Sequence, residues 1–461
     1  MKKLISLILV FVIVLGLCAC GNSGGADETT AAPEGLQIGY AKINITPDYS
    51  VGLRGYSNAE ERMSQGFVTY IFATCIAASE GAETILMYTV DTIAMEHETA
   101  ERYRTAITEA TGIPGDKIFF GATHSHSCPD RTTRYDKDLT QWLIDGAQQA
   151  LADRSAATML AGTQVIPNMN FVRHYLMEDG TYSGSNFGNT NQAYVGHATD
   201  PDPQMVLVKF DREGDKKDVL LVNWQAHPDS ASKIGYNSIA ASWVGPLRDE
   251  LENLCGMHVA YFTGASGNQN MDSNIPTEKH NLEWDEYGVK MGQLANEALS
   301  CLQPVNGTGI KTYRQMLEVE IDHSWDHLLD AANQVYALWK SAGKSAGDAL
   351  GRQYDFTSSY QARAIRTRAG MDKTTKLEIN AFSIDGVGFT TGTYEMFSNH
   401  SLYVKEHSPF DVTFVITGCS GYIPNPEAYD YRSYEADTGY FAKGAGEKLA
   451  EEYVKMLESV K

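Results

Sequence analysis

Cysteine is scarce in this sequence, with seven in 461 residues at wide and irregular spacing. Cys18 and Cys20 fall in the N-terminal segment, which leaves five for the rest of the chain. Without a C-x-x-C pair or a regular spacing, these five form neither a disulfide framework nor a zinc knuckle. We expect most of them to be small, buried apolar residues.

Basic residues are also few, 37 Lys and Arg against 58 Asp and Glu, so the formal net charge is −21. The charge becomes −23 if Lys2 and Lys3 are removed with a signal peptide. So acidic a chain has no electrostatic attraction for nucleic acid, and an anionic membrane surface would repel it apart from any attached lipid. The charge therefore excludes nucleic acid as a partner and favours solubility.

The longest apolar run stands at the N-terminus, at residues 4–17, after two lysines and before LCAC at residues 17–20. A basic start, an apolar core too short to span a bilayer and a small residue at the processing point are typical of a secretory signal peptide. The LCAC ending resembles the lipobox of bacterial lipoproteins, which implies a lipid on Cys20. The alternative is an ordinary cleaved signal with a chance cysteine. We expect residues 1–19 to be a lipoprotein signal peptide, and the mature chain to be extracytoplasmic and lipid-anchored to the bacterial cell membrane.

The next segment, residues 20–35, is rich in Gly, Ser, Thr, Ala and Pro and has no apolar periodicity. Such a composition buries too little surface to offset its chain entropy, which predicts a flexible tether. Residues 36–461 contain no second linker and no internal repeat. We expect them to form a single large domain.

Strand-like and helix-like segments alternate through this domain. Strands are predicted at residues 84–90, 117–122, 157–166, 205–210, 219–224 and 259–262, and helices at 96–111, 138–153, 285–302, 324–350 and 441–457. Long alternating runs at 308–321 and 376–391 predict antiparallel strands, the second run turning at Asp385-Gly386. A polar segment with interleaved tyrosines and arginines, residues 352–370, is expected to be a solvated loop or a rim of the substrate cleft. The fold class is therefore α/β (mixed α+β), with helices covering sheets of mixed parallel and antiparallel strands.

Histidines stand where two of the predicted strands end. THSHSCPD, residues 123–130, follows the strand at 117–122, and QAHPDS, residues 225–230, follows the strand at 219–224. Residues i and i+2 of an extended chain point to one side, so His124 and His126 can face one cleft if the extended geometry persists. Neutral imidazole is a common zinc ligand, which makes these two and His227 candidates; loop or structural histidines are the alternative. A glycine turn at residues 264–270 could hold an anion with its backbone N–H groups.

Together these stretches resemble the neutral/alkaline non-lysosomal ceramidase family, zinc-dependent amidases that hydrolyse the N-acyl bond of ceramide. The resemblance rests on IGYAKINITP at residues 38–47, GLRGY at 52–56, the histidine stretches, the glycine turn and GYIPNPEAY at 421–429 followed by Tyr434-Glu435. It covers essentially the whole of residues 36–461 and implies that they are a ceramidase-like catalytic domain.

The resemblance implies a zinc ion held by two histidines, a glutamate and a tyrosine. These are His124, His227, Glu395 and Tyr422. It also implies three catalytic residues around the ion. These are His126 for proton transfer or oxyanion contact, and Tyr434 and Arg173 for substrate and oxyanion contacts.

Three positions depart from the family pattern. Asn270 stands where the family has a serine, Cys128 where it has a glycine, and Cys419 where it has an additional tyrosine. The absence of the serine disfavours a serine nucleophile and leaves a metal-activated water unaffected. The two cysteines are expected to reshape the pocket, which leaves the true substrate open.

The leading hypothesis is a zinc-dependent hydrolase that cleaves the amide bond of an N-acylated lipid, or of another N-acyl amide, with metal-activated water. Its partners would be a lipid or small-molecule substrate and the membrane that holds Cys20. One alternative is a zinc esterase or hydrolase of a small polar substrate on the same scaffold. The other is a non-catalytic surface lipoprotein that binds a solute.

Overall fold

The computed structural model describes residues 35–56, 61–184, 193–307 and 309–461. The chain divides into two units, Met1–Ala32 and Pro33–Lys461, and every described residue belongs to the second. The predicted signal peptide, the lipid site at Cys20 and all but the last residue of the predicted tether lie outside the described residues. No helix within the described ranges combines the length and the apolar character that a membrane span needs.

A nine-stranded mixed sheet is the largest element, and eight of its strands follow the order β14-β12-β11-β6-β1-β3-β4-β5. The pairs β12–β14 and β4–β5 are parallel, and the other neighbours in this order are antiparallel. The strands are β14 (His258–Thr263), β12 (Val219–Trp224), β11 (Gln204–Arg212), β6 (Ser155–Val165), β1 (Gln37–Asn44), β3 (Phe72–Glu80), β4 (Glu83–Val90) and β5 (Ile118–Ala122), with β16 (Gln303–Pro304) paired to β6.

A second sheet of four strands has the order β17-β18-β19-β21. Its strands are β17 (Ile310–Glu320), β18 (Thr374–Ile384), β19 (Val387–Gly392) and β21 (Thr413–Thr417). The predicted hairpin joins β18 to β19, with Asp385 and Gly386 at φ 44° and 93°. Two successive residues of positive φ match the twist of the flanking strands, which is why Asp-Gly is favoured in this turn.

The two sheets pack face to face through buried aromatic residues. Phe119 of β5 stacks on Phe382 of β18 with ring centroids 4.3 Å apart, and Phe262 of β14 meets Phe414 of β21 at 5.7 Å. Fully burying a phenylalanine stabilises the fold by about 1.5–3 kcal/mol relative to leaving it exposed.

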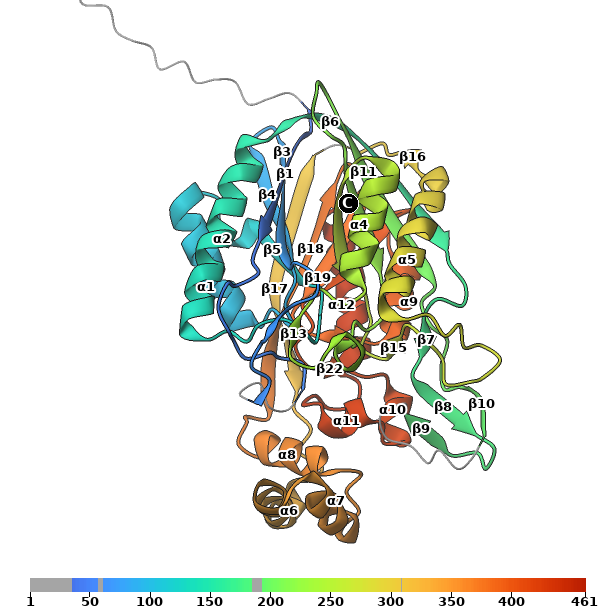
Figure 1. The fold of residues 1–461 in the computed structure, drawn as a ribbon. Coiled ribbons are helices and arrows are strands. Elements are labelled where there is room, and N and C mark those ends of the chain that lie inside the picture. Colours follow the sequence, from blue (N-terminus) through green and yellow to red (C-terminus); the bar gives the residue numbers. More distant parts are fainter. Residues whose placement is uncertain (1–34, 57–60, 185–192, 308) are drawn as a thin grey trace, which may run out of the picture. The chain divides into compact units, whose positions relative to one another are not determined.

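Helices cover the outer faces of both sheets (Figure 1). The helices α1 (His97–Thr111) and α2 (Thr133–Ala152) pack on the β1–β5 part, α4 (Val244–Cys255) and α5 (Trp284–Ala298) on the β11–β14 part, and α9 (Ser398–His407) and α12 (Ala445–Ser459) on the second sheet. The predicted fold class, helices covering sheets of mixed direction, is confirmed.

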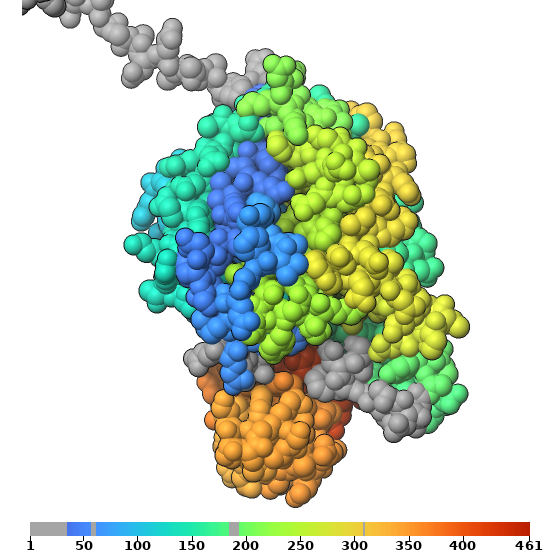
Figure 2. Space-filling view, viewed as in Figure 1, coloured from blue at the N-terminus to red at the C-terminus, as the bar shows by residue number. Residues whose placement is uncertain are grey.

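A helical insertion, residues 326–368, interrupts the chain between the paired strands β17 and β18. It contains α6 (Leu329–Ala342), α7 (Lys344–Gly351) and α8 (Ser359–Arg368), which share a small core of their own. In Figure 2 its residues are gathered in the orange region. The prediction of a solvated loop over residues 352–370 is wrong for Ser359–Arg368, which form the helix α8. Ser358 caps this helix by accepting a hydrogen bond from the Gln361 N–H, and Ala362 and Ile365 pack into the insertion's core.

The five cysteines of the described chain are all unpaired. Cys75, Cys128 and Cys419 are buried, as expected, and Cys255 and Cys301 are half-buried.

Candidate metal centre and its cavity

His124 and His126 follow β5 at the edge where β4 also ends. The backbone N–H of Thr123 donates to the Val90 carbonyl, and that of His124 to the Thr92 carbonyl. The chain does not stay extended here, because His124 has a φ of 64° in the left-handed region. A turn, and not the pleat of a strand, therefore sets the relation between the two imidazoles.

His227 follows β12, which lies far from β5 in the order of the sheet. The sheet curves so that the two ends of its strand order come together. The Thr89 Oγ1 of β4, which is the neighbour of the last strand β5, donates a hydrogen bond to the Tyr261 carbonyl of β14, the first strand, at 2.5 Å. The loop after β12 is fixed by a hydrogen bond from the His227 N–H to the Gln269 carbonyl. This contact between the sheet edges brings the ends of β5 and β12 to one place.

Glu395 and Tyr422 come from two short segments, one after β19 and one after β21 of the second sheet. β20 (Glu395–Met396) and β22 (Tyr422–Ile423) form a parallel pair in which these two residues are partners. The Glu395 N–H donates to the Gly421 carbonyl at 2.7 Å. Gly267 presses against this pair, since a Cβ there would lie 2.9 Å from the Glu395 carbonyl oxygen.

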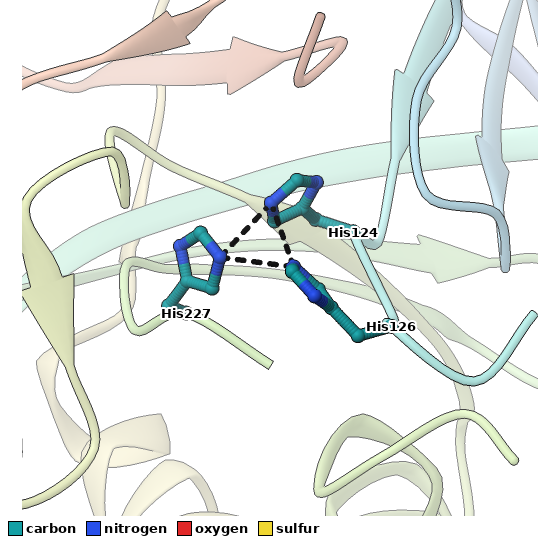
Figure 3. Close-up of side chains that lie close together, drawn as sticks. All are labelled: His124, His126 and His227. Carbon is teal, nitrogen blue, oxygen red and sulfur yellow. Dashed lines mark hydrogen bonds between the residues drawn. The ribbon is translucent and has the colours of Figure 1, made fainter. Parts of the chain in front are cut away.

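The three histidines point their Nε2 atoms at a common point, as Figure 3 shows. The His124 and His227 Nε2 atoms are 3.1 Å apart, and the His126 Nε2 lies 3.3 Å from the first and 3.0 Å from the second. Glu395 adds a carboxylate oxygen, with Oε2 at 3.4 Å from the His124 Nε2. Four donor atoms thus converge, three of nitrogen and one of oxygen.

The opposite ring nitrogens show how the imidazoles are oriented. His124 Nδ1 donates to the Ile93 carbonyl at 2.6 Å, and His227 Nδ1 to the Ser266 carbonyl at 3.4 Å. A proton held on Nδ1 by a backbone carbonyl leaves the lone pair of Nε2 free to bind a metal. His126 differs, because its Nδ1 faces a carboxylate, Asp229 Oδ1, at 3.7 Å.

Burial and neighbouring charges set the protonation of these groups. Burial lowers the pKa of His227 well below its usual range, and His124 and Arg173 lower it further. Burial also lowers the pKa of His126, to about 4, although Asp229 acts in the opposite direction. Burial has the same tendency at His124, but Glu395 outweighs it and raises that pKa. Two neutral imidazoles and a carboxylate that favours a positive charge therefore face one point.

The donor set fits a zinc ion. Ligand nitrogens about 2.0–2.1 Å from a tetrahedral zinc lie about 3.3 Å from one another, which matches the spacing of the Nε2 atoms. Glu395 Oε2 is buried and has no hydrogen-bond partner among the described residues. A buried carboxylate oxygen without a partner is costly, and a cation at the convergence point would satisfy it.

Arg173 and Tyr434 stand beside Tyr422. Arg173 Nη2 lies 3.4 Å from the Tyr422 hydroxyl, and its Nε pairs with Glu435 at 2.7 Å. Burial raises the pKa of Tyr434 to about 12, so this phenol keeps its proton at neutral pH. The Tyr434 ring meets the Tyr422 ring at 6.0 Å in an edge-on arrangement.

All seven predicted site residues line one open cavity of about 630 Å³. Its other lining residues are Arg54, Gly55, Tyr56, Ile93, Ala94, Glu96, Asp130, Asp229, Tyr360, Arg363, Cys419, Ser420, Gly421 and Tyr440. The segment 352–370 contributes Tyr360 and Arg363 to this lining, as expected of a rim, while binding of a substrate there remains a prediction. The roles assigned to the seven residues remain predictions.

Two solved structures share this arrangement of the chain. One, described as neutral ceramidase from Pseudomonas aeruginosa, superposes with a TM-score of 0.69 over 92% of this chain and 74% of its own, at 14% identity. The chain has the fold of neutral ceramidase. The other, described as ceramidase complexed with C2, has a TM-score of 0.68 over 92% of this chain and 75% of its own, also at 14% identity. No protein-family model and no curated protein sequence matches the chain.

The departures from the ceramidase pattern occupy different places in this fold. Cys419 lines the cavity and has a φ of 57°. Cys128 is fully buried, with its sulfur 3.7 Å from the Ala240 carbonyl, and it does not line the cavity. Asn270 lies on the short strand β15 (Gln269–Asn270), paired with β7 (Phe171–Val172), and is also outside the cavity lining.

Two N–H groups of the glycine turn, which was expected to be able to hold an anion, are used within the protein. The Gly267 N–H donates to the Met396 carbonyl at 2.9 Å, and the Gln269 N–H to the Ser266 carbonyl at 3.1 Å. The first of these hydrogen bonds holds the turn against β20, and the second lies within the turn.

Asp229 and Tyr56 are functional candidates that sequence reasoning missed. The Tyr56 hydroxyl donates to Asp229 Oδ1, and the Asp229 carboxylate faces His126. Arg62 lies over the Tyr56 ring at 4.8 Å and donates to the His126 carbonyl at 3.0 Å. Tyr56 and Asp229 lie within motifs that the resemblance had marked, GLRGY and QAHPDS, and that was the available signal.

Proposed function

We propose that this chain is a zinc-dependent hydrolase of the neutral ceramidase family that cleaves the amide bond of an N-acylated lipid or another N-acyl amide. One observation carries the proposal. Three imidazole nitrogens that lie 3.0–3.3 Å from one another converge with a Glu395 oxygen that has no hydrogen-bond partner in the described part of the chain, in an open cavity of a chain with this fold.

His124, His227 and Glu395 would hold the zinc together with Tyr422, the fourth ligand that the family resemblance implies. The alternative fourth ligand is His126, whose Nε2 lies 3.3 Å from that of His124 and 3.0 Å from that of His227. When bound, the ion acts as a Lewis acid that lowers the pKa of a bound water and polarises the substrate carbonyl. Burial raises the pKa of Tyr422 well above its usual range, while Arg173 acts to lower it. Arg173 is itself fixed by Glu435, so it supplies a permanent positive charge beside the phenol oxygen.

With Tyr422 as the fourth ligand, His126 would accept the proton of the attacking water and return it to the leaving nitrogen. Its Nε2 is aimed at the same point as the ligands, it is neutral at pH 7, and its Nδ1 faces Asp229. An imidazole backed by a carboxylate is stabilised when it takes up a proton, which suits a general base. Tyr434, which keeps its proton, would donate a hydrogen bond to the carbonyl oxygen as negative charge develops there.

The predicted lipoprotein signal completes the proposal. A lipid on Cys20 would hold the catalytic domain at the outer side of a bacterial cell membrane, where it would meet N-acylated lipids or other N-acyl compounds. Mass spectrometry of the mature N-terminus would test this directly, with a diacylated Cys20 as the expected result.

The activity is tested with a fluorogenic N-acyl amide and a matched ester. We expect the zinc-loaded chain to hydrolyse the amide, to lose activity when a chelator removes the metal, and to regain it when zinc is returned. Hydrolysis of the ester alone would contradict the amidase proposal and support an esterase with the same fold. Recovery of both compounds intact after long incubation would instead support a binding protein.

A further inference from the structure

The cavity contains three arginines, and two of them already have carboxylate partners. Arg54 pairs with Glu96 at 2.9 Å and with Asp130 at 3.6 Å. Arg173 is bound to Glu435. These pairs are internal to the protein and leave little net charge for a substrate to meet.

Arg363 is the exception. It is exposed at the cavity rim on α8 and makes no ion pair or side-chain hydrogen bond with any residue in the described ranges. Glu61 lines the neighbouring depression that Arg363 also lines, but the two are not within 4.0 Å of each other. The guanidinium therefore has its donors available for a ligand.

Aromatic rings hold Arg363 in place. It lies over the Tyr360 ring at 5.4 Å and the Trp339 ring at 5.9 Å. Tyr360 in turn meets Tyr434 at 6.2 Å, and Tyr434 meets the Tyr422 ring. A stacked guanidinium is pre-organised and loses less side-chain entropy when it binds an anion.

This series of rings connects the guanidinium to the metal centre along one wall of the cavity. Resting on the proposed function, we infer that Arg363 forms a subsite for an anionic group, a carboxylate in the first instance, which the substrate carries at a distance from its scissile amide. The substrate class is then an acidic N-acyl amide, and the helical insertion is the element that selects it.

The test uses the zinc-loaded full chain with N-octanoyl ω-amino acids of increasing chain length, each paired with its neutral carboxamide. A second series carries the carboxylate on the acyl side, as half-amides of dicarboxylic acids. We expect one chain length in one series to show a KM for the acid well below that of its carboxamide. In Arg363→Gln the KM of the acid divided by the KM of its carboxamide should rise about tenfold, as expected for losing a charge-assisted hydrogen bond to the carboxylate. The KM of the acid then approaches that of the carboxamide.

Arg366→Gln is the matched control. Arg366 lies on the same helix, over the Tyr336 ring at 4.1 Å, and does not line the cavity. Its loss should leave the KM ratio unchanged. Equal KM values for acid and carboxamide at every length in both series would overturn the subsite, and so would equal changes in both KM values in Arg363→Gln.

Failure of the proposed function would look different. If the wild-type chain hydrolyses neither the acids nor their carboxamides, the amidase proposal is contradicted. The subsite is then tested by measuring the Kd of the same acids for the wild type and for Arg363→Gln by calorimetric titration. A Kd about tenfold weaker in Arg363→Gln supports it. The same Kd in both proteins overturns it.

Discussion

At the scale of single residues, the three histidines differ in what holds their outer nitrogens. His124 and His227 donate to backbone carbonyls, which cannot change charge, whereas His126 faces the carboxylate of Asp229. His126 is also the least buried of the three imidazoles. The first arrangement suits a ligand with a fixed tautomer, and the second suits a group that gains and loses a proton.

His126→Gln should therefore keep the zinc and lose the reaction. We expect metal content close to that of the wild type and a kcat lower by about 10²–10⁴, the usual contribution of a general base. Zinc content and kcat would be measured on the same preparation. His258→Gln is the control, since His258 stacks on Tyr40 outside the cavity lining. A loss of zinc in His126→Gln would instead make His126 a ligand.

Asp229→Asn tests the carboxylate behind His126. We expect kcat to fall about 10–100-fold with zinc retained, because the amide cannot stabilise a protonated imidazole. Tyr56→Phe, which removes only the hydroxyl that donates to Asp229, should cost less. If kcat is unchanged in Asp229→Asn, the carboxylate has no part in proton transfer.

The sequence predicted which residues line the cavity better than it predicted which side chains form hydrogen bonds or ion pairs with one another there. Five of the seven lie in the short stretches that carry the family resemblance, Arg173 and Glu395 were carried over from the family at positions outside those stretches, and all seven line the cavity. Asp229 and Tyr56 stand 173 positions apart, and no local spacing indicates that they meet. The left-handed turn at His124 was also missed, because a histidine gives no sign of positive φ in the way a glycine does.

At the scale of elements, periodicity predicted the regular structure and failed where segments are very short. The strand at residues 219–224 has the bounds of β12, and the hairpin turn at Asp385-Gly386 is confirmed. β20 and β22 have two residues each, too few for any alternation to appear, yet they carry Glu395 and Tyr422. Family resemblance was the only sequence signal for those two residues.

Gly267→Ala should disturb β20 from outside the cavity. The added Cβ would meet the carbonyl oxygens of Glu395 and Met396 at 2.9 and 3.0 Å, and neither can move without shifting the strand. We expect a free energy of unfolding lower by about 1–3 kcal/mol and a weaker affinity for zinc.

Denaturant unfolding and a zinc titration would measure the two effects. Gly196→Ala is the control, because a Cβ at Gly196 meets nothing within 4 Å. Wild-type zinc affinity in Gly267→Ala would show that the position of β20 does not govern the metal centre.

At the scale of the whole described domain, contacts between distant segments bring the residues of the candidate metal centre together. The meeting of the sheet edges and the packing of the second sheet bring β5, β12, β20 and β22 together. Periodicity assigns strands but not their order or curvature, so this assembly was beyond the sequence. Buried ion pairs fasten the same contacts: Glu378 of β18 accepts from Arg104 of α1 at 2.6 and 2.8 Å.

Acid should destabilise the domain through these pairs. Burial raises the pKa of Glu378, but Arg104 and Arg314 outweigh it and hold the pKa at about 2. Because the folded state binds fewer protons than the unfolded state between pH 4.5 and 2, the stabilisation is complete above pH 4.5 and is lost as the pH falls toward 2. Glu435 has the same pKa of about 2, held by His174 and Arg173 against its burial.

Urea unfolding of the wild type and Glu378→Gln at pH 7, 5 and 3 measures this. The variant should be less stable at pH 7 by about 3–5 kcal/mol, since two arginines lose their buried partner, and its stability should fall less steeply with acid. Glu98→Gln removes an exposed carboxylate of α1 as the control. Parallel pH profiles for wild type and Glu378→Gln would contradict the assignment.

The most direct test of the central claim is the zinc content of the purified chain, measured by plasma mass spectrometry beside His227→Ala. His227 is buried and keeps Nε2 at the point where the donors converge, while the hydrogen bond of its backbone N–H to the Gln269 carbonyl is retained when the side chain is replaced by that of alanine. We predict one zinc per wild-type chain and less than about a tenth of that in the variant, given a folded protein by circular dichroism. The same zinc content in both proteins would contradict the metal centre and the hydrolase built on it.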